Sequence, residues 1–225
     1  LYVLEGAKGL DGIRRAAVDL PSEECPRGRL DELAGGAVHQ GVVLEAAPLP
    51  IMRFEQWIRH VSSPHEAVVV ILDGVEDPHN FGAIVRSACA CGAIAAVFGK
   101  HRAAPVSPVS LKSAAGAMEY LELVQAANLT RAVTMLQEAG FWIAALDPEG
   151  PQLLWDADLR GRVGLVIGSE GSGIRPLVLK KCDYRLRIPL ESPIDSLNAS
   201  VSAGIALAEC RRQRAGAATA PDSSG

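Results

Sequence analysis

From Ala67 onward, short apolar runs alternate with longer amphipathic or alanine-rich stretches. Continuous apolar runs rich in β-branched residues are typical of strands buried on both faces, and this alternation is the pattern of parallel strands joined by crossover helices. Six strands are predicted, at residues 67–72, 94–98, 121–124, 141–146, 163–167 and 184–188. The pattern therefore predicts an α/β domain built on a parallel sheet.

Helices are predicted between and after these strands, at residues 81–91, 111–120, 129–139, 174–181 and 197–214. The last ends with Arg211, Arg212 and Arg214, whose positive charges suit the C-terminal end of a helix dipole. Helices in these positions are expected to flank the sheet.

The first 47 residues follow a different pattern, with predicted strands at 1–4 and 41–45 and short helices at 10–17 and 30–34. Pro48 and Pro50 mark a boundary, after which residues 51–61 are predicted to form a short connecting helix. We expect a small α/β domain at 1–47, a linker at 48–66, the main domain at 67–214 and a disordered tail at 215–225. Because the chain begins at Leu1 without Met, directly in a predicted strand, the small domain is expected to be incomplete.

Composition narrows the class of protein only slightly. Lys and Arg number 22 against 26 Asp and Glu, so no overall positive field indicates a nucleic-acid partner, although net charge averages over faces. Seven basic residues could form a local basic patch if they cluster: Lys100, Arg102, Lys112, Arg160, Arg162, Arg185 and Arg187.

The five cysteines form no C-x-x-C pair, and their odd number favours a reduced chain in which they act as small buried hydrophobic residues. No apolar run approaches the roughly 18–20 residues of a membrane span, and no leader opens the chain. We therefore expect a cytoplasmic protein without a membrane partner.

Three polar or glycine-rich loops each follow a predicted strand and precede a helix. They are DGVEDPHN at 73–80, GSEGSG at 168–173 and PLESPIDSLN at 189–198. Ligands of open parallel sheets bind in the crevice beyond the carboxyl ends of the strands. The three loops are therefore expected to form one composite site.

In the first loop, Asn80 is a candidate N-cap for the following helix, and Arg86 stands six residues later. Arg86 could contact a phosphate through its fork of donors, or could be an ordinary surface arginine. The loop also contains Asp73, Glu76 and His79, but no second His or Cys stands at ligand spacing, so no metal site is predicted.

The second and third loops argue against two other chemistries. Gly168, Gly171 and Gly173 give G-x-x-G-x-G, which is neither the dinucleotide fingerprint nor a P-loop. This turn suits close backbone approach to a ligand without phosphate, with Glu170 facing a cation or polar donor, or it is a simple strand-to-helix turn. Ser196 and Asn198 could each cap the last helix, and the absence of a G-x-S-x-G elbow disfavours a serine nucleophile.

Taken together, the segments at 72–88, 165–174 and 188–209 resemble the three motifs of the SPOUT-class 2′-O-methyltransferases of the SpoU or TrmH family, in family order. Upstream, HQGVV at 39–43 resembles the end of the small L30-like substrate-binding domain of the RlmB-type branch. The resemblance implies a parallel sheet whose C-terminal part forms a deep trefoil knot. It also implies a homodimer in which the arginine of one protomer serves a site completed by the other.

The resemblance further implies S-adenosylmethionine as methyl donor, without a metal, and assigns the site residues. Donor contacts are expected from Gly168, Ile188 and Leu197, with Glu170 and Pro189 shaping the pocket. The implied catalytic residue is Arg86, assisted by Asn80, Glu170, Ser196 and Asn198.

Family logic makes the arginine a general base, but a guanidinium pKa of about 12.5–13.8 lies far from the working pH. We therefore favour the hypothesis that Arg86 orients the adjacent phosphate and stabilises developing alkoxide charge.

The predicted function is methylation of a guanosine 2′-hydroxyl in the peptidyl-transferase region of 23S rRNA, in free RNA or a large-subunit precursor. One alternative is transfer RNA ribose methylation. A second is a catalytically silent RNA-binding or ribosome-assembly protein. A nucleotide-dependent oxidoreductase is disfavoured because the dinucleotide fingerprint is missing.

Overall fold

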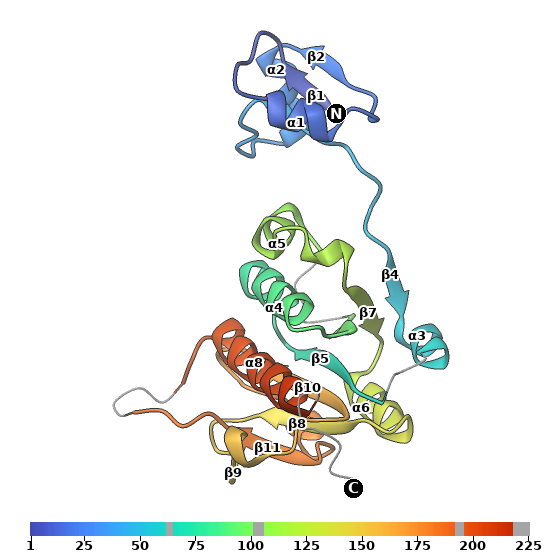
Figure 1. Cartoon of the computed structure of the whole chain (residues 1–225), viewed down its shortest axis with the longest axis vertical. Coiled ribbons are helices and arrows are strands. Elements are labelled where there is room, and N and C mark those ends of the chain that lie inside the picture. The colour runs from blue at the N-terminus through green and yellow to red at the C-terminus, as the bar shows by residue number, and fades with distance from the viewer. Residues whose placement is uncertain (62–64, 101–105, 192–195, 218–225) are drawn as a thin grey trace, which may run out of the picture. The chain divides into compact units, whose positions relative to one another are not determined.

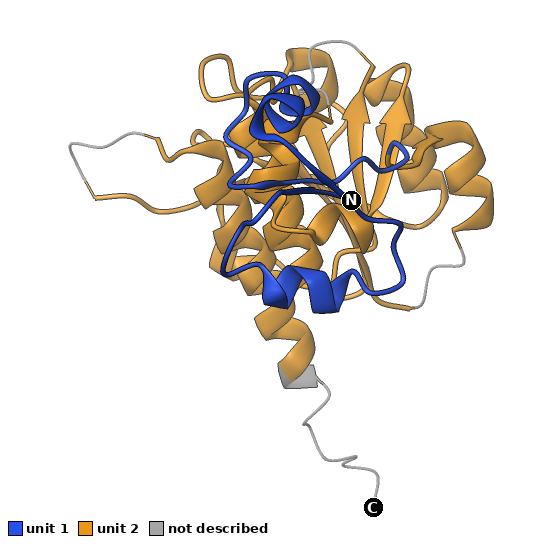
Figure 2. Ribbon diagram, turned by 90° about the horizontal axis from the view of Figure 1, so that it is seen from above, with its two compact units in different colours: residues 1–48 blue, residues 49–225 orange. Residues whose placement is uncertain are grey.

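The computed structural model describes residues 1–61, 65–100, 106–191 and 196–217. The chain divides into two compact units, Leu1–Pro48 and Leu49–Gly225 (Figure 2). Each unit has its own sheet, and the loops of the predicted site all belong to the second. Within the described residues, no helix is long and apolar enough to cross a membrane.

The first unit is a three-stranded sheet with two helices. The central strand β1 (Tyr2–Leu4) pairs in parallel with β2 (Glu23–Cys25) and antiparallel with β3 (Val42–Val43). Helices α1 (Asp11–Ala16) and α2 (Arg27–Ala34) connect the strands. Val3, Cys25 and Leu30 form its small buried core. The short strand β2 was not predicted, because its Glu-Glu-Cys sequence carries no apolar alternation.

The second unit contains an eight-stranded sheet in which every pairing is parallel, in the order β4-β7-β6-β5-β10-β8-β11-β9 (Figure 1). Its strands are β4 (Ile51–Arg53), β5 (Ala67–Asp73), β6 (Ala95–Gly99), β7 (Glu122–Ala126), β8 (Trp142–Leu146), β9 (Gln152–Leu153), β10 (Arg162–Gly168) and β11 (Tyr184–Arg187). The six predicted strands are confirmed to within two residues at each end. The two additional strands, β4 and β9, lie at the two edges of the sheet, where short pairings carry little sequence signal.

Alternate residues of the central strands pack on opposite faces, as the two-residue period of a strand requires. In β5 the side chains of Val68, Val70 and Leu72 join one core cluster, and those of Val69 and Ile71 join the other. The first face is covered by α4 (Pro78–Ala90), α5 (Pro108–Ala114) and α8 (Ala199–Ala217), and the second by α3 (Phe54–His60), α6 (Leu129–Glu138) and α7 (Pro176–Leu179). Burial on both faces explains why these strands read as continuous apolar runs.

The predicted linker at 48–66 is wrong for its central part. Residues 51–53 form the edge strand β4 rather than the start of a helix, and α3 follows directly. Phe54 and Trp57 are fully buried, and the indole Nε1 of Trp57 donates to the Glu122 carboxylate on β7 at 2.6 Å. The apolar face of this segment therefore belongs to the core of the second unit.

Two helix predictions also change. The stretch predicted at 111–120 is α5 followed by a 3-10 turn, η1 (Ala117–Glu119), because Ala115 and Gly116 adopt positive φ between them. The helix predicted at 174–181 is only the single turn α7. A second 3-10 turn, η2 (Leu154–Asp156), follows β9. The tail predicted at 215–225 begins inside α8, and its residues 218–225 lie outside the described residues.

Candidate active site

The site lies where the chain direction switches between the two halves of the sheet. The central strands β5 and β10 pair along their full length, ending at Asp73 opposite Gly168. After β5 the chain continues through α4 toward β6 and β7, whereas after β10 it continues through α7 toward β11 on the other side. Loops that diverge from neighbouring parallel strands leave a crevice at this point, which is the usual ligand site of open α/β sheets.

One polar residue from each of the three predicted loops meets the others at this crevice. Asn80 donates through Nδ2 to Oε1 of Glu170 at 3.0 Å, and Asn198 donates through Nδ2 to Oδ1 of Asn80 at 3.0 Å. The Asn198 amide also hydrogen-bonds to the Glu170 carboxylate. These residues are 90 and 118 positions apart from Asn80 in the sequence. We call them the Asn-Glu-Asn cluster.

Local helix-capping explains how the two asparagines are positioned. The N-cap of α4 is Asp77, whose carboxylate accepts from the backbone N–H of His79 at 2.9 Å, and Pro78 takes the first helical position. The expectation that Asn80 caps this helix is therefore wrong. Asn80 lies within the first turn, 7% exposed, with its amide directed into the cluster.

Asn198, by contrast, caps the last helix as expected. Its Oδ1 accepts from the backbone N–H groups of Ser200 at 2.8 Å and Val201 at 3.3 Å. Capping uses the carbonyl oxygen, so the amide nitrogen is left to join the cluster. Ser196 makes no hydrogen bond to the described residues, and Asn198 alone performs the capping.

Gly168 is required because two backbone segments meet there. A Cβ at Gly168 would lie 2.3 Å from the carbonyl carbon of Gly173 and 2.5 Å from the nitrogen of Ile174. The intervening loop is closed by reciprocal backbone hydrogen bonds between Ser169 and Gly173, at 3.1 and 3.0 Å. The close backbone approach expected at this glycine is thus an approach of the chain to itself.

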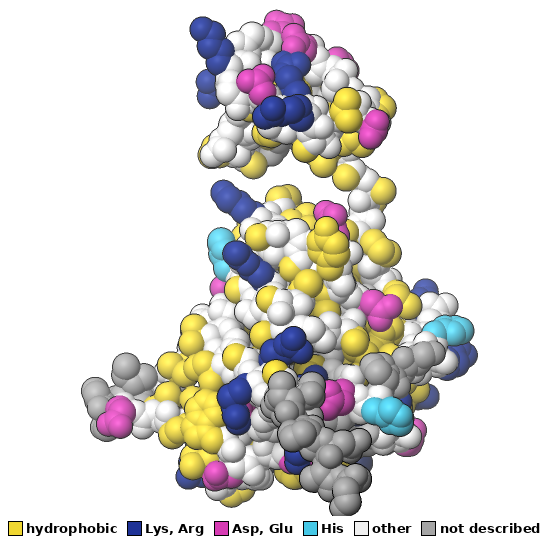
Figure 3. Space-filling model, in the orientation of Figure 1, with side chains coloured by type: hydrophobic (Ala, Val, Ile, Leu, Met, Phe, Trp, Pro, Cys, Tyr) yellow, Lys and Arg dark blue, Asp and Glu magenta, His cyan; other side chains and the backbone are white. Residues whose placement is uncertain are grey.

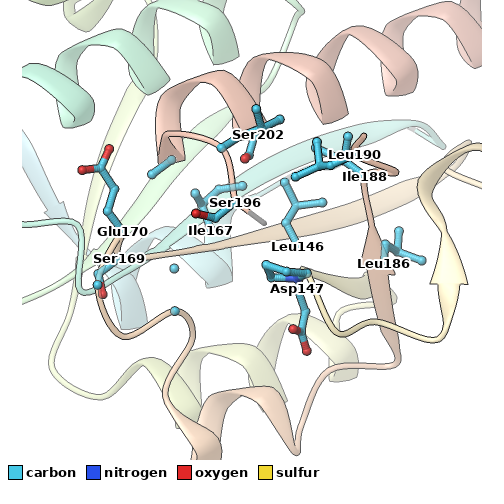
Figure 4. A pocket seen from close by; sticks show the side chains of 16 residues that line it. Leu146, Asp147, Ile167, Ser169, Glu170, Leu186, Ile188, Leu190, Ser196 and Ser202 are labelled. Carbon is cyan, nitrogen blue, oxygen red and sulfur yellow. The ribbon is translucent and has the colours of Figure 1, made fainter. Parts of the chain in front are cut away.

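A cavity of about 270 Å³ adjoins the cluster (Figure 4). Of the predicted donor-binding residues, Gly168, Glu170, Ile188 and Leu197 line it, and so does Ser196. Pro189 does not line the cavity and is exposed. Figure 4 shows apolar side chains at one end of the cavity, among them Leu146, Ile188 and Leu190, and Glu170 with Ser169 at the other.

The loop after β8 contributes a residue that sequence reasoning missed. Asp147 lines the cavity, and its Oδ2 accepts from Nε of Arg185 at 2.8 Å, while its Oδ1 accepts from the backbone N–H of Glu149 at 3.0 Å. The available signal was its position, because Asp147 directly follows a predicted strand at the same edge of the sheet as the three loops. Ser202, on the first turns of α8, also lines the cavity.

A second hollow of about 450 Å³ adjoins the first and shares five lining residues with it, Glu170 among them. Its lining includes Asn80, the exposed carboxylates of Glu76 and Asp77, and Arg175. Glu170 of the cluster therefore lines both a cavity with a largely apolar end and a hollow bordered by charged groups. Two reactants that must meet could occupy these two spaces.

Asp73 and Arg175 form an ion pair at the edge of the second hollow. Asp73 is 0% exposed; its Oδ1 accepts from Nε of Arg175 at 2.6 Å and its Oδ2 from the Arg175 backbone N–H at 2.8 Å. The bonds join the end of β5 to the loop after β10, across 102 residues. The sequence signal was a carboxylate ending an otherwise apolar strand, which the prediction treated only as a rejected metal ligand.

Arg86 lies apart from the cluster. It is exposed on α4, lines neither cavity, and makes no hydrogen bond or ion pair within the described part of the chain. The structure therefore brings Asn80, Glu170 and Asn198 together, places Ser196 at the cavity wall, and leaves Arg86 outside. Among the described residues, no group of three or more His, Cys, Asp or Glu side chains could hold a metal.

The predicted basic residues do not form one patch of free charges. Arg160 pairs with Asp158 and Arg185 with Asp147, while Arg187 donates to the carbonyls of Gly150 and Pro151. Arg162 donates to the Ala139 carbonyl, and Arg102 lies outside the described residues. Figure 3 shows Lys and Arg side chains scattered over the visible face, with acidic side chains between them.

Comparisons with known proteins agree with this geometry. The model of the SpoU rRNA Methylase family matches residues 67–208, and the model described as RNA 2′-O ribose methyltransferase substrate binding matches residues 1–52. The chain is 42% identical over 189 residues to the 23S rRNA (guanosine-2′-O-)-methyltransferase RlmB of Xanthomonas campestris pv. campestris, covering 84% of this chain and 76% of the relative. The RlmB of Escherichia coli K12 is 40% identical over 185 residues, covering 82% and 76%.

Solved structures give the same result for the fold. The SpoU methyltransferase AviRb from Streptomyces viridochromogenes, in complex with AdoMet, aligns with a TM-score of 0.74 and 26% identity over 95% of this chain and 83% of AviRb. A crystal structure of an RNA 2′-O ribose methyltransferase aligns with a TM-score of 0.71 and 26% identity, covering 95% and 80%. The predicted fold class, a parallel sheet flanked by helices and preceded by a small α/β domain, is confirmed. The motif resemblance is confirmed as well, and the chain belongs to the SpoU rRNA methylase family.

Proposed function

We propose that this protein transfers a methyl group from S-adenosylmethionine to the ribose 2′-hydroxyl of a guanosine in 23S rRNA. The observation that carries the proposal is the Asn-Glu-Asn cluster, whose Glu170 lines both the 270 Å³ cavity and the hollow bordered by Arg175. Family membership supports methyl transfer to RNA. The names of the relatives, aligned over 76% of their length, support the 23S rRNA guanosine.

The cavity fits the methyl donor by its chemistry. Apolar side chains from the ends of three strands form one end, suited to an adenine ring, and the glycine loop supplies backbone polar groups. Within the described part of the chain its lining contains no Lys or Arg, as expected for a ligand without phosphate. Gly168, Glu170, Ile188 and Leu197 would hold the donor, with Leu146 and Asp147 completing the wall. When bound, the donor supplies an electrophilic methyl carbon for attack by the ribose oxygen.

The protein's own groups act on the ribose hydroxyl, which is a poor nucleophile until its proton is weakened or removed. Glu170 is held by both asparagine amides, so its carboxylate is fixed in position before the substrate arrives. Arg86, whose guanidinium stays protonated at working pH, orients the adjacent phosphate and stabilises the charge that develops on the oxygen. In this assignment Arg86 does not remove the proton, which passes to solvent as the ribose oxygen is methylated.

The position of Arg86 supports a site shared between two protomers. The residue is exposed and does not reach the cluster of its own chain. In a homodimer, Arg86 of each protomer would complete the site of its partner. Within each protomer, the C-terminal part of the sheet would form the family's trefoil knot. A test is to mix Arg86→Ala with Glu170→Gln chains after each alone has proved inactive.

Action across the dimer predicts that random pairing restores about a quarter of wild-type activity, because half of the dimers then hold one intact site of two. Action within one chain predicts no restoration. Refolding or coexpression of the two variants ensures that subunits exchange, and native mass spectrometry confirms that the mixed dimer has formed.

Activity is tested by transfer of labelled methyl from S-adenosylmethionine to a transcript of the peptidyl-transferase domain of 23S rRNA, with a tRNA pool in parallel. The expected result is incorporation at one guanosine 2′-oxygen, abolished by Arg86→Ala. Incorporation into tRNA alone would favour the alternative substrate. Donor binding without transfer to any RNA would favour a catalytically silent protein.

A further inference from the structure

Arg175 is held by Asp73 through its backbone N–H and Nε, while its two Nη groups are free of hydrogen bonds within the described residues. The Asp73 carboxylate is buried, and its bonds to Arg175 fix the plane of the guanidinium. The side chain of Arg175 is 46% exposed. An arginine held in this way presents a preorganised pair of donors, the geometry that binds a phosphate through two parallel hydrogen bonds.

Arg175 borders a third hollow, of about 400 Å³, which lies beyond the ends of β6 and β7 against α7. Lys100 lines the same hollow, just after β6, and its ammonium group has no ion-pair partner within the described residues. Leu177, 70% exposed, adds an apolar surface to the lining. Cationic and apolar groups together match a nucleotide unit, which has a charged phosphate and a sugar with apolar faces.

Charge distinguishes this hollow from the second one, which Arg175 also borders. Among the described residues, the lining of the third hollow contains no Asp or Glu, whereas that of the second includes Glu76, Asp77 and Glu170. A phosphate would be repelled by the three carboxylates on one side of Arg175 and attracted to Lys100 on the other. The basic residues at other loops are less available, because Arg160 and Arg185 are already paired with acids.

We propose that this third hollow binds a backbone phosphate of the substrate RNA through Arg175 and Lys100, so that a neighbouring nucleoside is directed into the second hollow beside the Asn-Glu-Asn cluster. The proposal rests on the proposed function in taking RNA as the substrate, and it goes beyond that function by assigning a phosphate site and its two residues. Asp73 acts as the positioning residue that orients Arg175.

Two variants test the site while preserving the fold. Lys100→Gln removes one charge from a side chain that makes no hydrogen bond or ion pair with the described residues, and Arg175→Lys keeps a cation opposite Asp73 while removing the free Nη donors. Arg160→Gln is the matched control. It removes one positive charge just before β10, at the N-terminal ends of the strands. The seven-residue strand β10 separates this position from the loop of Arg175 by roughly 20 Å.

For each variant, the measurements are RNA affinity as a function of salt, KM and kcat for the 23S transcript, and the dissociation constant of S-adenosylmethionine. For Lys100→Gln and Arg175→Lys, we expect KM for RNA to rise about tenfold and the slope of log K against log salt to fall by about 0.7–0.9 per lost contact. Donor affinity should be unchanged in both variants. Arg160→Gln should match wild type in all three measurements.

The outcomes separate the two proposals. Wild-type methylation with unchanged KM and salt slope in both variants would overturn the phosphate site and leave the proposed function standing. RNA binding that weakens as expected in both variants, without methyl transfer by the wild type, would support the site and overturn the proposed function. An equal loss in Arg160→Gln would show a general charge effect and overturn the assignment to this hollow.

Discussion

Substitution of Gly168 by alanine tests whether the glycine loop is needed for the shape of the proposed donor cavity. The added Cβ would lie 2.3 Å from the carbonyl carbon of Gly173, 2.5 Å from the nitrogen of Ile174 and 2.7 Å from the carbonyl oxygen of Gly173. All three are backbone atoms, so no side chain can rotate away. Relief requires the 169–174 loop to move by about 1 Å, which is the scale of overpacking that costs about 1–3 kcal/mol.

That free energy reports directly on the cavity, because Gly168 and Gly173 both line it. If the whole cost falls on donor binding, S-adenosylmethionine should bind about 5- to 150-fold more weakly, since each 1.4 kcal/mol is a factor of ten. If the loop cannot move, the same cost appears as a lower free energy of unfolding. Isothermal titration calorimetry and urea denaturation together measure both contributions.

Gly171→Ala provides the control, because a Cβ there meets no atom within 4 Å and the residue has no positive φ. It changes the same loop by the same single carbon, and because Gly171 also lines the cavity it is a control for stability alone: it should unfold like wild type. A Gly168→Ala protein with wild-type donor affinity and unfolding free energy would refute the reasoning, because the backbone contact would then be absent in solution.

Three further predictions follow from the buried and clustered groups. Asp73→Ala leaves Nε of Arg175 without its partner, and because the guanidinium is partly hydrated we expect the free energy of unfolding in urea to fall by about 2–3 kcal/mol. A fall below about 0.5 kcal/mol would contradict the ion pair. Glu170→Gln keeps an oxygen acceptor for both asparagine amides but removes the charge, so kcat should fall at least about tenfold with donor affinity retained, and an unchanged kcat would exclude a role for the carboxylate charge. Burial raises the pKa of the Cys182 and Cys210 thiols to about 12, so at pH 8 only about one in 10⁴ is ionised, and peptide mass spectrometry should find them unalkylated in the native protein but alkylated in urea. Rapid native alkylation of either would contradict the burial seen in the structure.

The central strands were predictable because their physical signal is local. A strand covered on both faces needs apolar side chains at every position, and β5, β8 and β10 show this as uninterrupted runs. Edge strands have no such requirement, so β4 was taken for the start of a helix. The burial of Trp57 against Glu122, 65 residues away, is a consequence of that pairing and left no readable pattern.

Parallel topology also made the general location of the site predictable. Once the runs are taken as parallel strands, their carboxyl ends share one edge, and the three loops must gather there. Asn80, Glu170 and Asn198 meet as that reasoning requires. Their individual bonds were not predictable: Asn80 was assigned to a cap because the sequence permits two starts for α4, and Asp77 with Pro78 occupies the earlier one.

By itself, the sequence determined the fold class, the order of the central strands along the chain and the family, because apolar periodicity and motif spacing are properties of short segments. Only the tertiary structure decided that Asp73 pairs with Arg175, that Asp147 lines the proposed donor cavity and that Arg86 stands apart from its own cluster. Each of these depends on strand order and register, which bring together residues distant in the chain. A hydrogen bond or ion pair of about 3 Å requires that register to be exact, and no local pattern encodes it.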